Sequence, residues 1–120
     1  MTTLYGIKNC DTVKKARNWL DQHGIAYHFH DFRVDGLTPE LLQHFAAHLD
    51  WKKLLNRSST SWRQLSAEQQ SDLSQEKALQ LMLDTPTLIK RPVLDLGDKL
   101  ILGFSAKEDS YAGLAMHKKP

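Results

Sequence analysis

The stretch Tyr5-Gly-Ile-Lys-Asn-Cys-Asp-Thr-Val-Lys-Lys-Ala-Arg17 marks the point where an extended segment turns into a helix. It also contains the single cysteine of the chain, Cys10. Residues 2–7 before it read as a short buried strand. Asp11 or Thr12 offers a side-chain oxygen that caps the helix start. The stretch therefore predicts a strand, a tight loop with a thiol, and a helix.

The segment after this loop predicts a parallel crossover unit. The helix carries an apolar stripe made of Val13, Ala16 and Leu20. Gly24 supplies the helix stop, because glycine adopts the left-handed conformation common just past a helix end. Apolar and polar residues alternate over residues 25–30, which is the period of a strand with unlike faces. A strand, helix and strand at this spacing place the two strands parallel.

The remainder of the chain predicts a helical insertion and then a hairpin. Thr38-Pro39-Glu40 is an N-cap, a first-turn proline and an acidic first turn, so a helix is expected at about 38–49. The apolar spacing stays helical from 51 to 83, with a capping box at Ser66–Gln69 and a further cap at Ser74. Gly97-Asp98 joins two short strands as a hairpin, and a last helix is expected near 106–115.

Bulk properties exclude several classes of protein. With 120 residues, 41% hydrophobic and 25% charged, the chain fits one packed domain. The net charge of +2 and the lack of a basic tract argue against a nucleic-acid arm. No apolar run reaches the roughly 20 residues of a membrane span, and no targeting segment stands at the start, so we expect a cytoplasmic protein. One cysteine excludes a disulfide within the chain and suits a reducing compartment.

The residues alone leave two interpretations of Cys10 open. A helix N-terminus favours a thiolate, which is the nucleophilic form, and Lys8 and Lys14 add positive potential that Asp11 opposes. Cysteine is also among the most buried residues and often only fills space. Both interpretations fit the local sequence.

Two arginines and a proline far from Cys10 add a second group of candidates. Arg57 follows an apolar pair, and Arg91 stands directly before Pro92, which opens the hairpin. Arginine can bind an oxyanion or a carboxylate with two parallel hydrogen bonds, although a single arginine is more often a solvated surface charge. A proline at a strand start can be a simple edge residue, or it can follow a cis peptide bond that shapes a loop.

Together these motifs resemble one family. The segments 9–17, 55–57, 89–93 and 102–104 resemble the arsenate reductase-like family of thioredoxin-fold proteins, the ArsC/Spx group, and within it the YffB type. The resemblance runs over about residues 3–114. It implies an α/β fold with a thioredoxin-like mixed four-stranded sheet and an inserted helical subdomain. The whole of residues 1–120 would form a single ArsC-like domain, with the thioredoxin-like part at about 1–35 and 86–116 and the insertion at about 37–85.

The resemblance also implies a site. Cys10 corresponds to the catalytic thiol, Arg57 and Arg91 to anion-binding arginines, and Pro92 to the cis-proline. Lys8 and Asn9, beside the cysteine, are expected to join anion binding. Glutathione is expected as co-substrate with no bound cofactor or metal, glutaredoxin as a further partner, and the protein as a monomer without nucleic-acid or membrane partners.

Two departures from the family pattern narrow the function. Phe104 stands at the apparent third-arginine position of arsenate reductases, and Val13 stands where the regulator branch has a second cysteine. We therefore expect a glutathione-dependent thiol oxidoreductase whose mixed disulfide is resolved by an external thiol. Arsenate reduction coupled to glutathione and glutaredoxin is one alternative. A non-enzymatic, Spx-like protein-binding adaptor is another.

Other polar motifs are assigned to ordinary roles. The pairs His28/His30 and His44/His48 have spacings that can hold a metal, but no third ligand stands in register with either pair. The run 58–61 reads as a polar loop rather than an oxyanion site.

Overall fold

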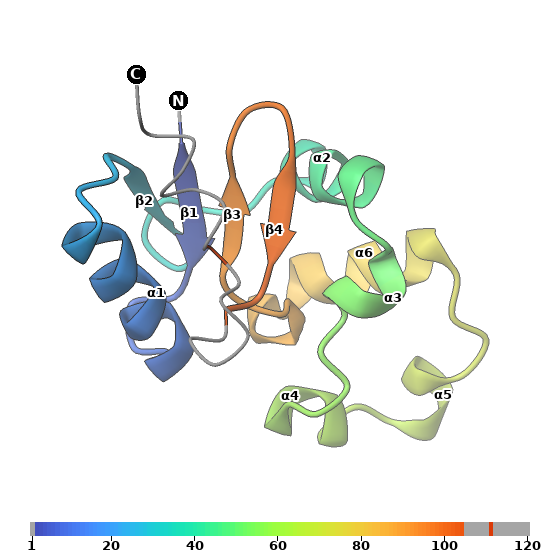
Figure 1. Cartoon of the computed structure of the whole chain (residues 1–120). Coiled ribbons are helices and arrows are strands. Elements are labelled where there is room, and N and C mark those ends of the chain that lie inside the picture. Colours follow the sequence, from blue (N-terminus) through green and yellow to red (C-terminus); the bar gives the residue numbers. More distant parts are fainter. Residues whose placement is uncertain (1, 105–110, 112–120) are drawn as a thin grey trace. The chain divides into compact units, whose positions relative to one another are not determined.

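The computed structural model describes residues 2–104 and residue 111. The chain divides into two compact units, one made of Met1–Asp35 with Arg91–Pro120 and the other of Gly36–Lys90. The helices and strands of both units are labelled in Figure 1. The first unit contains β1 (Thr3–Gly6), α1 (Asp11–Gln22), β2 (His28–Asp31), β3 (Val93–Asp95) and β4 (Leu100–Leu102). The second unit contains α2 (Pro39–His48), α3 (Trp51–Leu54), α4 (Thr60–Arg63), α5 (Ala67–Gln70), α6 (Gln75–Asp84) and the 3₁₀ helix η1 (Pro86–Leu88).

The first unit is built on a mixed four-stranded sheet with the order β2-β1-β3-β4. β1 and β2 are parallel, with Thr3 beside His28, because α1 carries the chain back between them. β3 runs antiparallel to β1, with Thr3 beside Asp95, and β4 runs antiparallel to β3. This arrangement confirms the predicted fold class, a thioredoxin-like mixed sheet with helices.

One face of this sheet packs against α1 and forms the core of the first unit (Figure 1). The buried cluster consists of Leu4, Val13, Ala16, Leu20, Leu94 and Tyr111. Leu4 and Leu94 are register partners on β1 and β3, and the α1 residues are those of the predicted apolar stripe. Burying each large apolar side chain stabilises the fold by about 1.5–3 kcal/mol. The core therefore fixes α1, and the loop before it, on the sheet.

Helix caps in the second unit follow the sequence. Thr38 caps α2 by accepting a hydrogen bond from the Leu41 N–H at 3.2 Å, with Pro39 in the first turn. The capping box of Ser66 and Gln69 is formed at α5, and Ser74 caps α6. These contacts confirm the predicted helices, although the region from 51 to 83 is divided into four of them. Among the described residues, no helix is both long enough and apolar enough to cross a membrane.

Two predicted boundaries are wrong, and each has a local cause. The strand expected over residues 25–30 begins only at His28, because the Ile25 N–H donates to the Leu20 carbonyl at 3.0 Å and finishes the helix end instead. The N-cap of α1 is Cys10 rather than Asp11 or Thr12, because the Cys10 backbone is extended and its carbonyl accepts from Lys14 N at 3.0 Å. The helix expected near 106–115 lies, apart from Tyr111, outside the described residues.

Candidate active site

Cys10 occupies the N-cap position of α1 and is half-buried. Its N–H donates to the Ile7 carbonyl at 3.2 Å, so the loop turns tightly between the end of β1 and the helix. No side chain in the described part of the chain caps this helix end. The first-turn N–H groups and the positive end of the helix dipole would therefore stabilise an anion at this position, because no capping side chain competes for them.

The loop before Cys10 is held by a buried carboxylate that the sequence interpretation missed. Asp31, at the end of β2, is 6% exposed. Its Oδ2 accepts from the Lys8 N–H at 3.1 Å, and its Oδ1 accepts from the Arg33 N–H at 2.8 Å. The signal for it was an acidic residue at the carboxyl end of a strand beside the thiol loop. Asp31 thus positions the Lys8–Cys10 segment.

Arg91 and Pro92 lie at the same end of the central strands as this loop. The pairing of Tyr5 with Val93 places the residues that follow β1 opposite those that precede β3. The Arg91–Pro92 peptide bond is cis, Pro92 is buried, and its carbonyl accepts from the Gly103 N–H at 2.8 Å. Arg91 is half-buried. The first unit therefore brings the Cys10 loop and the Arg91–Pro92 segment together at one end of the strands β1 and β3.

The exposed residues Lys8 and Asn9 belong to the same loop, whereas Arg57 belongs to the second unit. The Arg57 guanidinium carbon lies 5.6 Å from the centre of the Trp62 ring, and its side chain is exposed. The Asn56 N–H, just before it, donates to the Leu88 carbonyl at 2.7 Å. The backbone at Arg57 is thus fixed within its own unit.

The two positions that depart from the family pattern are apolar in the structure. The Phe104 ring packs against the core cluster, with its centre 4.8 Å from that of Tyr111. Val13 is fully buried. Neither position offers a charge or a second thiol.

Among residues 2–104 and 111, neither histidine pair belongs to a cluster of three histidine, cysteine or acidic side chains. His44 and His48 contact each other with ring centres 4.9 Å apart, and His48 Nδ1 lies 3.1 Å from the His44 carbonyl. His30 packs against Tyr5, with ring centres 5.0 Å apart.

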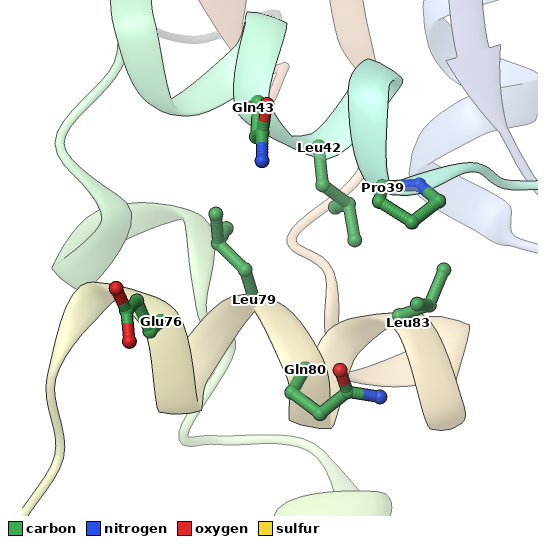
Figure 2. Close-up of a pocket in the computed structure, with 7 residues that line it drawn as sticks. All are labelled: Pro39, Leu42, Gln43, Glu76, Leu79, Gln80 and Leu83. Carbon is green, nitrogen blue, oxygen red and sulfur yellow. The ribbon is translucent and has the colours of Figure 1, made fainter.

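The second unit contains an apolar pocket of about 160 Å³ between α2 and α6. In Figure 2 the side chains of Leu42, Leu79 and Leu83 converge on it, and Glu76 lies at its rim. It offers neither a nucleophile nor a group of convergent donors, so its lining does not point to chemistry.

Comparison with known proteins gives a consistent result. A family model described as "ArsC family" matches residues 5–111. A solved structure titled "YFFB (PA3664) protein" is 48% identical, covers 94% of this chain and 97% of its own, and superposes with a TM-score of 0.89. An arsenate reductase (ArsC) related protein from Brucella melitensis is 46% identical, with coverage of 92% and 93% and a TM-score of 0.78. An uncharacterized protein of Haemophilus influenzae is 45% identical over 90% of this chain and 95% of its own.

Proposed function

Since the chain belongs to the ArsC family, we propose that it is a glutathione-dependent thiol oxidoreductase with Cys10 as its nucleophile. The observation that carries the proposal is the position of Cys10, the single cysteine of the chain, at a helix N-terminus that no described side chain caps. Attack requires a thiolate, and the unpaired N–H groups of such a helix end favour an anion there.

The proposed cycle consists of two thiol–disulfide exchanges. In the first, the Cys10 thiolate attacks the glutathione sulfur of a mixed disulfide, so that the substrate leaves as a thiolate and Cys10 becomes bonded to glutathione. In the second, a free glutathione thiolate attacks the sulfur of that bound glutathione, which regenerates the Cys10 thiolate and releases oxidised glutathione. The net reaction consumes one free glutathione: its thiol is oxidised into the new disulfide as the substrate thiol is released, and the glutathione of the mixed disulfide stays at the disulfide level. The resolving thiol is external because Val13, not a cysteine, follows in the first turn of α1.

We propose that cationic side chains, together with the amide of Asn9, hold the carboxylates of glutathione. Arg91, beside the cis-proline, lies at the same end of the central strands as the Cys10 loop and is the first candidate. The exposed Lys8 and Asn9 of that loop are the next. Arg57 is proposed for the same role from the family resemblance. A hydrogen bond to a charged group contributes about 1.5–3 kcal/mol, so loss of Arg91 should raise the KM for the disulfide substrate at least tenfold.

The test is reduction of the mixed disulfide of glutathione and 2-mercaptoethanol, with oxidised glutathione measured as product. We expect Cys10→Ser to abolish turnover, Arg91→Gln to raise KM, and Lys99→Gln, an exposed change in the hairpin, to leave both constants unchanged. Intact-mass spectrometry should detect the Cys10–glutathione adduct when free glutathione is withheld. Turnover by Cys10→Ser at the wild-type rate would refute the proposal.

An arsenate assay on the wild type and on one further variant separates arsenate reduction from thiol exchange. Phe104 provides no cation at the third-arginine position, so we expect no arsenate turnover with glutathione and glutaredoxin, and partial turnover after Phe104→Arg. We further propose that the protein works as a monomer in the cytoplasm, with glutaredoxin as a partner that recycles the adduct. Light scattering measures whether the protein is a monomer, and cell fractionation measures whether it is in the cytoplasm.

A further inference from the structure

A second concave site lies in the first unit, against the outer flank of α1. Its lining residues are Arg17, Asp21, Ile25, Ala26, Tyr27 and Phe29, and it is an open hollow of about 390 Å³. It adjoins β2, an edge strand of the sheet. The thiol chemistry described above uses none of these residues.

The guanidinium of Arg17 is held in one orientation. Its Nε donates to the Tyr27 hydroxyl at 3.2 Å, and its Cζ lies 4.3 Å from the centre of the Phe29 ring. Stacking and a hydrogen bond through Nε leave the two terminal NH₂ groups as donors, in the geometry that binds a carboxylate with two hydrogen bonds. The Tyr27 hydroxyl accepts from Arg17, so its own proton is available to a second acceptor.

Asp21 adds the opposite charge to the same pocket. It follows Arg17 by one helical turn, but no ion pair joins the two, or joins either of them to another of the residues described here. An arginine that precedes its acid by four residues is the weaker order for such a pair on a helix. The pocket thus presents a cation and an anion that are both available to a ligand.

We propose that this pocket binds the zwitterion of an α-amino acid. The carboxylate of the ligand accepts from Arg17 and Tyr27, its ammonium donates to Asp21, and its carbon atoms lie against Ile25 and Phe29. The zwitterion can belong to a free amino acid or to the glutamyl end of glutathione, which carries the same pair of groups. Arg17 follows Cys10 by seven residues, which is a rise of about 10 Å along the helix. This distance is comparable to the length of an extended tripeptide, and glutathione is a tripeptide.

The experiment is a titration followed by NMR, with the Arg17 Nε–H and the amides of Ala26, Tyr27 and Phe29 as reporters. Glycine is the zwitterionic probe, acetate carries the carboxylate alone, and S-methylglutathione carries the glutamyl end but cannot exchange disulfides. We expect glycine to bind with a Kd of about 1–10 mM, as suits an open site, and acetate to bind at least threefold more weakly.

Variants assign the contacts. Arg17→Gln should weaken glycine binding at least tenfold, and Asp21→Asn should weaken glycine while leaving acetate unchanged. Tyr27→Phe keeps the ring and removes the hydroxyl, so it should weaken both probes modestly. Lys99→Gln is the matched surface control and should change neither probe.

The source of the zwitterion follows from the third probe. Tighter binding of S-methylglutathione than of glycine, with shifts that extend to the Cys10 amide, assigns the site to the glutamyl end of glutathione. Equal or weaker binding assigns it to free amino acids. Reporter shifts that persist in Arg17→Gln, equal affinity for glycine and acetate, or no shift at 100 mM glycine would overturn the proposal. The titration on Cys10→Ser should match the wild type, so failure of the thiol chemistry leaves the result readable.

Discussion

Gly6→Ala tests how closely the end of β1 approaches the first turn of α1. A Cβ atom built on Gly6 would lie 2.7 Å from Val13 Cγ2 and 3.3 Å from Val13 Cγ1, whereas ordinary contacts begin near 3.4 Å. Val13 is fully buried and β-branched, so its methyl groups cannot rotate away without cost. The alanine therefore either displaces the first turn of α1, which Cys10 caps, or forces Val13 out of its rotamer.

The expected effect is a loss of about 1–2 kcal/mol in the free energy of unfolding. Overpacking a core costs about 1–3 kcal/mol, and replacing glycine returns about 0.4–1 kcal/mol by restricting the unfolded chain. With an m-value of about 2 kcal/mol/M, the urea midpoint should fall by about 0.5–1 M. Val13→Ala alone should cost about 2 kcal/mol through the cavity that it leaves.

The double variant decides whether the contact is the cause. In Gly6→Ala/Val13→Ala the new methyl group enters the space left by the lost ones. The double variant should therefore lose less stability than the sum of the two single losses, by at least 1 kcal/mol. Urea unfolding at constant m measures this coupling, and the rate of Cys10 alkylation reports whether α1 has shifted. Losses that add within about 0.5 kcal/mol would show that the close approach has no energetic weight.

Three further predictions follow from contacts elsewhere. Asp31→Ala removes the acceptor for the Lys8 and Arg33 N–H groups, so it should cost about 1–3 kcal/mol in urea unfolding and speed hydrogen exchange at both amides; unchanged exchange would contradict the anchoring role. Ser74→Ala removes the cap of α6 and should cost about 1 kcal/mol, measured as a fall in Tm of about 4 °C. Burial raises the pKa of Tyr111 above its ordinary 10.0, so the folded state keeps a proton that the unfolded state releases above about pH 10, and stability should fall as the pH rises further. Tyr111→Phe should move the alkaline unfolding midpoint upward.

Features coded by adjacent residues were predictable from the sequence. Thr38, Pro39 and Glu40 specify the start of α2 by a cap, a fixed φ and a favourable charge, none of which needs the rest of the fold. The hairpin follows in the same way from Gly97, whose φ of +95° suits glycine and few other residues. Periodicity then located the face of α1 that packs on the sheet.

Features that depend on distant residues were not predictable. Asp31 holds a loop 23 residues earlier in the chain. Its place at the end of a strand marks it as a candidate, but the residues next to it do not show which N–H groups it accepts from. The Arg17 pocket forms because the chain at the start of β2 returns Tyr27 and Phe29 to the flank of α1, ten or more residues after the arginine. Cys10 became the N-cap because the turn from Ile7 sets its backbone, while Asp11 and Thr12, the better capping residues by type, follow one and two positions too late.

The sheet order also sets the sequence of events during folding. The central pair of the sheet joins Thr3 of β1 to Asp95 of β3, so it cannot form on the ribosome until the whole helical unit has been synthesised. That unit is continuous in sequence and rich in local helical contacts, which form quickly. Once folded, the compact unit spans less space than an unfolded segment of the same length, and it shortens the loop that β1 and β3 must close. Substitutions that unfold the insertion should therefore slow formation of the sheet even where they touch none of its strands.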